Sequence, residues 1–334
     1  MSVVRLGIIG CGNNMAGHLR RLSTFPDVEI VAIAEPVKEM VDRVIAQIPA
    51  LKDVQYYAGH REMLERAEID AVEISTPHTL HFEHARDSLL AGKHVLVEKP
   101  MVCTTEHAEE LIKVRDQVGK HLIVNYQRHF RSEYLYCRER FVSGVWSAPY
   151  FIQGWQCADW KVRTTGKWRQ NPALSGGGQL SDSGSHLLDI LLWVSGQKPK
   201  EVFAFVDNRG LEVDVLSAIS VRFENGAIGT ISVIGDSHTH PRGIGEGLYF
   251  WHDQGMAEIS GEADKPRLIV RDPEERVIEA SEMPAASTPD RNFIDAILGK
   301  DEIRSTAESA LEVVRLTEAA IRSASTGQPV VIQR

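Results

Sequence analysis

Short apolar runs alternate with helix patterns through the first 125 residues, and this alternation constrains the fold more than any other feature. Residues 3–9, 28–34, 71–75 and 95–97 are predominantly apolar, as expected of strands that are buried on both faces. Strands that alternate with helices form parallel sheets covered by helices on both sides. We therefore expect residues 1–125 to form an α/β domain with a doubly wound parallel sheet.

The second part of the chain, residues 126–334, has a different pattern. A helix is predicted over about 183–194, and strand-like runs predominate after it, with the tight-turn pair Asn225-Gly226 between two of them. Two further helix patterns, over 289–298 and 306–325, follow these runs. Consecutive strands favour antiparallel pairing, so we expect an α+β domain with a mostly antiparallel sheet.

Composition excludes several classes of protein. The net charge is −9 without a basic stripe, which argues against a nucleic-acid partner. No apolar run approaches the roughly 20 residues needed to span a bilayer, and the first residues already read as a strand rather than a leader. The four cysteines are scattered and form no CxxC pair. We expect a cytoplasmic protein with reduced thiols.

The first predicted strand leads into the glycine turn 10–15, Gly-Cys-Gly-Asn-Asn-Met. A dinucleotide-binding turn uses its first glycine to turn tightly and its second to let the backbone approach the pyrophosphate. Asn13 and Asn14 then open a helix whose amide groups can bind an anion. Met15 stands where a third glycine is usual, and Gly17 compensates only if the turn is two residues longer.

Glu35 ends the second predicted strand, 25 residues beyond Gly10. Its carboxylate can accept hydrogen bonds from the adenosine ribose and repels a 2′-phosphate, and no arginine is adjacent in sequence. This favours NAD over NADP. The ends of two later strands lie at the same edge of a parallel sheet, and they contribute further expected cofactor-binding residues: Thr76, Pro77, His78, His81, Glu98 and Lys99.

Lys99, Asp182 and His186 are the side chains best suited to transfer a proton. Asp182 and His186 lie four residues apart, hence on one face if the segment is helical. An imidazole with a pKa of about 6.5 exchanges protons near neutrality, and an ammonium stabilises negative charge on an oxygen. We expect an enzyme that oxidises an alcohol or reduces a ketone, with either Lys99 or His186 as the immediate base.

Each of these three residues has a structural alternative. Lys99 is alternatively an exposed lysine at a strand end. Asp182 is alternatively a cap of the helix that starts near residue 183. His186 is alternatively a core histidine whose ring nitrogens are hydrogen-bonded within the protein. The occurrence of all three in one chain with a glycine turn favours the chemical interpretation.

Three motifs together resemble one family. They are the GxG turn, TPHTLHFEHARDSLLAGKHVLVEKPM over residues 76–101 and GGGQLSDSGSHLLDILLW over residues 176–193. Their sequence and order are similar to those of the glucose-fructose oxidoreductase, inositol dehydrogenase and rhizopine-catabolism (Gfo/Idh/MocA) superfamily. The resemblance implies an NAD-binding Rossmann domain over residues 1–125. It also implies a domain for substrate binding and oligomerisation over residues 126–334, with an open-faced sheet.

The resemblance further implies an NAD-dependent dehydrogenase that acts on a secondary alcohol of a sugar, glycoside or inositol, as a homodimer or homotetramer. It places Tyr126 and Arg128 near the substrate. Trp155 and Trp168 can stack on a sugar ring, although packing is an equal alternative. Two other activities stay open, a dinucleotide-binding regulator without turnover and a glycosidase that uses NAD.

Two groups of histidines invite a metal interpretation. His78, His81 and His84 are spaced three apart, so they drift around a helix and do not converge. The group His238-Thr239-His240 falls in a predicted loop with no other ligand nearby. We therefore expect no metal site.

Overall fold

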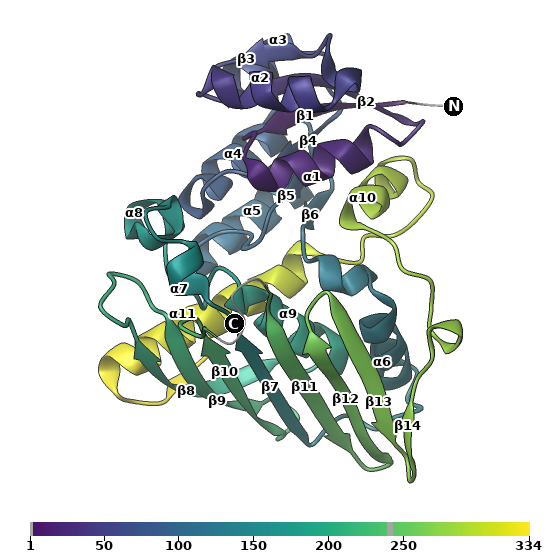
Figure 1. Cartoon of the computed structure of the whole chain (residues 1–334), viewed down its shortest axis with the longest axis vertical. Helices are drawn as coiled ribbons and strands as arrows, with labels where there is room; N and C mark the ends of the chain where they lie inside the picture. Colours follow the sequence, from purple (N-terminus) through teal and green to yellow (C-terminus); the bar gives the residue numbers. More distant parts are fainter. Residues whose placement is uncertain (1–2, 239–242) are drawn as a thin grey trace. The chain divides into compact units, whose positions relative to one another are not determined.

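The computed structural model describes residues 3–238 and 243–334, which form two compact units (Figure 1). The first unit comprises Met1–Val102, Glu106–Tyr126 and Ser287–Glu308. The second comprises Cys103–Thr105, Gln127–Ala286 and Ser309–Arg334. The sequence pattern predicts a single boundary after residue 125, whereas the chain crosses between the units several times and residues 287–308 pack with the first.

The first unit contains a sheet of six parallel strands in the order β3-β2-β1-β4-β5-β6. Its strands are β1 (Val4–Ile9), β2 (Val28–Ala34), β3 (Gln55–Tyr57), β4 (Ala71–Ile74), β5 (His94–Val97) and β6 (Leu122–Val124). The order places β1 at the centre, so the turn after β1 lies beside the ends of β2 and β4. The expected doubly wound parallel sheet is confirmed.

Helices and short 3-10 turns connect these strands. They are α1 (Asn13–Leu22), α2 (Lys38–Gln47), η1 (Pro49–Leu51), α3 (His60–Arg66), η2 (His78–Leu80), α4 (His81–Leu90) and α5 (Thr105–Val118). Helix α1 begins at Asn13, so the glycine turn is not lengthened and Gly17 lies inside the helix. The longer turn that compensation by Gly17 requires is therefore absent. Met15 is fully buried in the core beside Leu6 and Ile8, so its side chain packs the helix against the sheet.

A segment from near the end of the chain completes the first unit. Helix α10 (Pro289–Ile297) buries Phe293 and Ile294 in the same core as α1. Arg291 on this helix pairs with Asp27 at 2.8 Å, and Thr306 forms an antiparallel bridge with Ile123 at the edge strand β6. Apolar packing and ion pairing together attach the returning segment.

The second unit contains a nine-stranded sheet in the order β14-β13-β12-β11-β7-β10-β9-β8-β15. Its strands are β7 (Phe151–Cys157), β8 (Pro199–Asp207), β9 (Leu216–Phe223), β10 (Ile228–Ile234), β11 (Gly245–His252), β12 (Gly255–Glu262), β13 (Lys265–Arg271), β14 (Glu275–Val277) and β15 (Val330–Val331). Only the β7–β10 pair is parallel, so the expected mostly antiparallel sheet is confirmed. Gly226, with φ of 91°, makes the turn predicted between β9 and β10.

Helices cover one face of this second sheet (Figure 1). The helical segments of the unit are η3 (Gln127–Phe130), α6 (Ser132–Val142), α7 (Trp160–Arg163), η4 (Trp168–Gln170), α8 (Pro172–Ser175), α9 (Gly184–Ser195), η5 (Ala280–Glu282) and α11 (Ala307–Thr326). Helix α9 packs on β7 and ends at Gly196, a left-handed cap with φ of 66°, close to the predicted end of the helix near residue 194. Burial alternates along β9, so the opposite face is open to solvent.

In the part of the chain that the structure describes, no helix combines the length and the apolar character that crossing a bilayer requires.

Candidate functional site

The turn between β1 and α1 has the geometry of an anion-binding loop. Gly10 adopts φ of 86°, and a Cβ there would lie 2.7 Å from the carbonyl oxygen of Ser75, so only glycine fits. Gly12 precedes the helix with ordinary backbone angles, and a Cβ at Gly12 would meet no atom within 4 Å. The open space beside Gly12 and the first amides of α1, which lack partners within the helix, suit a pyrophosphate.

Glu35 at the end of β2 is anchored to this turn. Its carboxylate accepts hydrogen bonds from the backbone N–H of Cys11 at 2.8 Å and of Val37 at 3.1 Å. Arg43 on α2 donates to the side-chain oxygen of Asn13 at 3.1 Å. Thus a guanidinium does reach the turn, although no arginine is adjacent to Glu35 in sequence.

The segment after β4 contains two partly exposed and two buried residues among those expected to bind the cofactor. Thr76 and Pro77 are partly exposed, whereas His78 and His81 are buried. The ring nitrogens of His81 face the carbonyl oxygens of Pro100 at 2.8 Å and Thr76 at 3.0 Å, and burial lowers the pKa of this imidazole. The His81 ring is thus fully buried with both nitrogens directed at the backbone, and a contact between His81 and a cofactor stays a prediction.

Glu98 and Lys99 follow β5. Lys99 is partly exposed, while Glu98 is 7% exposed. The carboxylate of Glu98 accepts hydrogen bonds from the Asn14 amide at 2.6 Å and from the Lys99 backbone N–H at 3.2 Å. Glu98 therefore faces inward and ties the glycine turn to the strand end that carries Lys99.

In the second unit, Asp182 lies just before α9 and is 5% exposed. Its Oδ2 accepts hydrogen bonds from the indole N–H of Trp160 at 2.8 Å and from Nε of Arg169 at 2.9 Å. Ser183 occupies the position before the helix and makes no side-chain capping bond. The Asp182 carboxylate is thus held by side chains of the segment 160–170, so capping does not account for it.

His186 lies in the first turn of α9. Most of this helix is buried, but His186 is partly exposed, unlike its neighbours Ser185 and Leu187. Asp182 lies outside α9, which begins at Gly184, so the condition that both residues share one helix is not met. The exposure of His186 is unlike that of a core histidine.

Comparison with known proteins identifies the chain. The family described as "Oxidoreductase family, NAD-binding Rossmann fold" (GFO_IDH_MocA) matches residues 4–126, and the GFO/IDH/MocA C-terminal domain matches residues 134–262. The chain belongs to the GFO/IDH/MocA family. The superfamily and the two-part α/β fold expected from the sequence are confirmed.

Two curated relatives and one solved structure illustrate this GFO/IDH/MocA membership. D-glucoside 3-dehydrogenase of Escherichia coli is 30% identical over 58% of this chain and 55% of that protein. The scyllo-inositol 2-dehydrogenase (NADP(+)) IolW of Bacillus subtilis is 28% identical over 62% of this chain and 55% of that protein. The WlbA dehydrogenase of Bordetella pertussis, solved with NADH and UDP-GlcNAcA, shares the fold at a TM-score of 0.85. It is 22% identical and covers 100% of this chain and 99% of its own. The matches span between 30% and 59% of the length of the curated relatives.

The four other residues expected near the substrate of this GFO/IDH/MocA protein, Trp155, Trp168, Tyr126 and Arg128, lie in different surroundings. Trp155 and Gln156 are neighbours on β7, so their side chains point to opposite faces of the sheet. The Gln156 amide donates to Ser183 Oγ at 3.0 Å, so Trp155 lies on the face away from Ser183. A contact between Trp155 and a sugar substrate stays a prediction. Trp168 is partly exposed, and the guanidinium of Arg169 lies 4.4 Å from the centre of its ring.

The other two residues expected near the substrate are buried. Tyr126 is fully buried, and Arg128 is 4% exposed. Arg128 pairs with Glu246 at 2.5 Å, and Glu246 also accepts from the hydroxyl of Tyr134 at 2.7 Å. A buried ion pair accounts for Arg128, and a role at the substrate stays a prediction for both residues.

Potential metal ligands gather in two places among the residues that the structure describes. His18, Glu73 and Asp290 form a buried group, and His60, Glu83 and Asp87 a partly exposed one. Arg61 already occupies the second group by pairing with both of its carboxylates. His84 Nδ1 lies 3.1 Å from Thr76 Oγ1, whereas the His81 ring faces backbone carbonyl groups. The two rings therefore have different partners and do not converge on one point. Thr239 and His240 lie outside the described residues.

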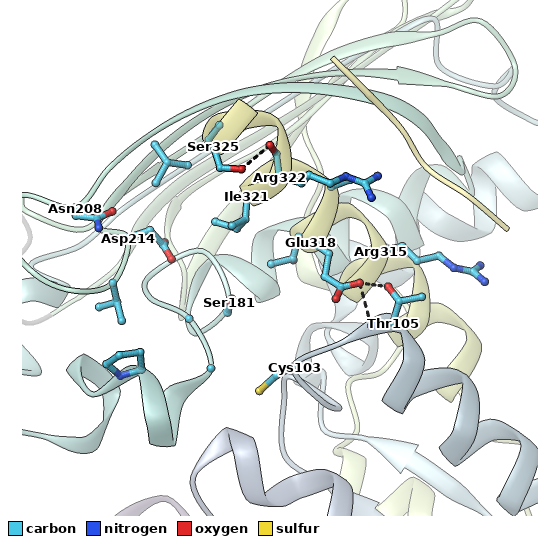
Figure 2. Close-up of a pocket in the computed structure, with 18 of the residues that line it drawn as sticks. Cys103, Thr105, Ser181, Asn208, Asp214, Arg315, Glu318, Ile321, Arg322 and Ser325 are labelled. Atoms are coloured by element: carbon cyan, nitrogen blue, oxygen red, sulfur yellow. Dashed lines mark hydrogen bonds between the residues drawn. The ribbon is translucent and has the colours of Figure 1, made fainter. Parts of the chain in front are cut away.

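A cavity of about 920 Å³ lies in the second unit, between α11 and the glycine-rich loop at Gly176 and Gly177 (Figure 2). Gly176 and Ser181 line one side and Glu318 and Ile321 of α11 the other. Asp182 and His186 are not among its lining residues, so we do not assign the substrate to this cavity.

Three functional candidates lack a signal in the sequence. Arg169 is one of several basic residues in the segment 160–170, and only its contact with Asp182 singles it out. Arg43 contacts Asn13, and His18 contacts Glu98. In each pair the two residues lie far apart in the sequence. Only the tertiary structure reveals these partnerships.

Proposed function

We propose that this protein is an NAD-dependent oxidoreductase that transfers a hydride between nicotinamide and a secondary alcohol of a sugar, glycoside or inositol. One observation carries the proposal. A turn with room for a pyrophosphate at Gly12 is tied through Glu98 to the strand end that bears Lys99, a suitable acid–base group. The dehydrogenase activities of the two curated relatives support the substrate class.

The cofactor is held by the edge of the first sheet in this proposal. Gly10, Gly12 and the first amides of α1, at Asn13, Asn14 and Met15, bind the pyrophosphate through the backbone. Glu35 accepts from the adenosine ribose, and Thr76 and Pro77 line the same edge. Bound NAD supplies the hydride acceptor.

NAD is the preferred dinucleotide in this proposal, and NADP the weaker ligand. The carboxylate of Glu35 lies at the turn and repels a 2′-phosphate. Arg43 opposes this preference because its guanidinium also reaches the turn. The Glu35 carboxylate is buried and held by two backbone groups, whereas Arg43 is exposed to solvent that screens its charge, so we expect Glu35 to dominate.

Proton transfer falls to Lys99 and His186, with Asp182 as the orienting group. Lys99 stabilises negative charge on the reacting oxygen, and either Lys99 or His186 takes the hydroxyl proton. Asp182 accepts from a substrate hydroxyl or orients the imidazole. Trp160 and Arg169 keep the Asp182 carboxylate in one orientation, which is the requirement for such a role.

A substrate screen tests the proposal. The purified protein is incubated with NAD and, in turn, sugars, glycosides and inositols, and NADH formation is followed by absorbance. On the substrate found, Lys99→Ala and His186→Ala should each lower kcat by about 100-fold to 10,000-fold while NAD still binds. Lys113→Ala, an exposed lysine on α5, is the control. Unchanged turnover in both active-site variants contradicts the proposed mechanism.

Two other functions give different results in the same screen. A regulator binds dinucleotide without forming NADH on any substrate. A glycosidase that oxidises transiently cleaves a glycoside with no net NADH, which product analysis detects.

We also propose a homo-oligomer, a homodimer or a homotetramer, formed in the cytoplasm. The open face of the second sheet presents apolar side chains to solvent, among them Phe205, 69% exposed, and Ile228, 46% exposed. Light scattering of the purified protein measures the assembly, and a monomer contradicts it.

A further inference from the structure

A buried group of charged side chains lies behind the glycine turn in the first unit. His18 on α1 is 5% exposed, and its Nδ1 contacts the carboxylate of Glu73 and, at 2.6 Å, Oδ1 of Asp290. On the other side of the ring, Nε2 lies 3.1 Å from Oε1 of Glu98. The single imidazole is therefore in contact with three carboxylates from β4, α10 and the end of β5.

The charges in this group require a protonated imidazole. Burial by itself lowers the pKa of His18, but the charge of Glu73 and hydrogen bonds to the three carboxylates raise it to about 12. Arg21 adds a second cation, at 2.7 Å from the other oxygen of Asp290. Burial raises the pKa of Glu73 despite the neighbouring imidazolium, so Glu73 is the carboxyl that can hold a proton.

The His18 imidazolium lowers the pKa of Glu98. Burial alone raises the pKa of Glu98, yet the hydrogen bond and charge of His18, with help from Lys99 and Asn125, lower it to about 2. Glu98 is thus ionised throughout the neutral range. An ionised carboxylate forms the stronger hydrogen bonds, and Glu98 directs two of them to the amide of Asn14 and the backbone of Lys99.

We propose that His18 is a positioning residue of the cofactor site, because its buried imidazolium orients the Glu98 carboxylate, which in turn fixes Asn14 in the glycine turn and the backbone of Lys99. The inference rests on the proposed function, since it assumes that the turn binds a dinucleotide. Helix geometry supports it: Asn14 and His18 lie four residues apart on α1, so both side chains point at Glu98.

A purely structural role would give a different result. The ion pair of Asp27 with Arg291 also fastens α10 to the first sheet, and the Asp27 carboxylate contacts Arg291 and Lys300 instead of the group around Glu98. Loss of that pair should lower stability without changing dinucleotide affinity. Asp27→Asn is therefore a control matched in burial and location.

The experiment measures NAD affinity by calorimetry and thermal stability by melting, in the wild type, His18→Gln, Glu73→Gln and Asp27→Asn. We expect His18→Gln to weaken NAD binding about 10-fold to 100-fold, as for loss of a hydrogen bond to a charged group. Glu73→Gln mimics a protonated Glu73 and should bind NAD within about threefold of the wild type, as should Asp27→Asn despite a lower melting temperature.

A pH series adds a readout that packing alone would not change. In the wild type Glu98 stays ionised, so NAD affinity should vary little between about pH 8 and pH 5.5. Without the imidazolium, burial is the dominant influence and raises the pKa of Glu98, so the affinity of His18→Gln should fall as pH falls. Glu73, Asp290, Arg21 and Lys99 are the other charged groups of the cluster, and they are unchanged in this variant.

Each outcome tests the positioning role of His18 separately from the proposed dinucleotide-binding function. If His18→Gln folds and binds NAD within about twofold of the wild type, the inference is overturned and the proposed function stands. If His18→Gln does not fold, Glu98→Gln replaces it, and wild-type affinity in that variant overturns the inference equally. A wild type that binds neither NAD nor NADP overturns the proposed function and this inference with it.

Discussion

The carboxylate of Glu35 accepts a hydrogen bond from the backbone N–H of Cys11 at 2.8 Å, so the acid that ends β2 is fastened to the glycine turn after β1. This contact holds a negative charge at the place where the adenosine ribose of a dinucleotide binds in folds of this type. Arg43 brings a positive charge to the same turn through Asn13. The balance between these two side chains determines which dinucleotide is preferred.

Glu35→Gln should therefore reduce the preference for NAD over NADP. The amide retains an acceptor for Cys11 but removes the charge that repels a 2′-phosphate, so we expect a loss of about tenfold in the ratio of the two affinities. Arg43→Ala should shift the ratio in the opposite direction. Calorimetric titration with each dinucleotide measures both, and Glu29→Gln, an exposed acid on the same strand, is the control. An unchanged ratio in Glu35→Gln would assign the discrimination to other residues.

Gly12→Ala should separate binding from folding. The added methyl group meets no atom within 4 Å and the backbone angles are ordinary, so the melting temperature should stay within about 2 °C of the wild type. The same methyl group occupies the space next to the turn, so NAD affinity should fall at least about tenfold.

Gly10→Ala is the counterpart of that variant. It places Cβ 2.7 Å from a backbone oxygen at a φ of 86°, so we expect a destabilisation of about 1–3 kcal/mol in chemical unfolding. Equal stability of the two variants would contradict the structure of the turn.

Trp160→Phe should lower kcat on the substrate found in the screen. Phenylalanine retains an aromatic ring but loses the N–H that holds Asp182, and the carboxylate then relies on Arg169. We expect a decrease of about 3-fold to 10-fold in kcat/KM with intact dinucleotide binding. Trp146→Phe, also a buried tryptophan of the second unit, controls for the general effect of the substitution. Turnover that falls equally in both variants would argue against a specific role for the Asp182 contact.

Stability of the first unit should decrease in acid. The hydrogen bond from Arg291 lowers the pKa of Asp27 to about 2, despite the opposing effect of burial. A depressed carboxyl pKa stabilises the folded state above its unfolded value of 3.8, and this contribution is lost as pH falls toward 2. Urea unfolding at about pH 7 and pH 3 should show a smaller difference in Asp27→Asn than in the wild type. A difference of the same size in both proteins would show that other groups carry the acid sensitivity.

Local patterns in the sequence determined the elements of the fold because periodicity and turn residues act over a few residues. The glycine at 196 ends α9, the pair Asn225-Gly226 turns between β9 and β10, and the turn after β1 begins a helix at Asn13. The alternation of strands and helices was sufficient to predict the parallel sheet.

Only the tertiary structure decided which side chains meet across long stretches of chain. His18 contacts Asp290 across 272 residues, and Trp160 at the start of α7 reaches Asp182. The face on which Trp155 lies depends on the register of β7 within the sheet, and no local pattern reports that register. The sequence therefore determined the helices, the strands and the motif residues through short-range preferences. The buried partners of those residues depend on sheet order and on the return of residues 287–308 to the first unit, which are long-range outcomes of packing.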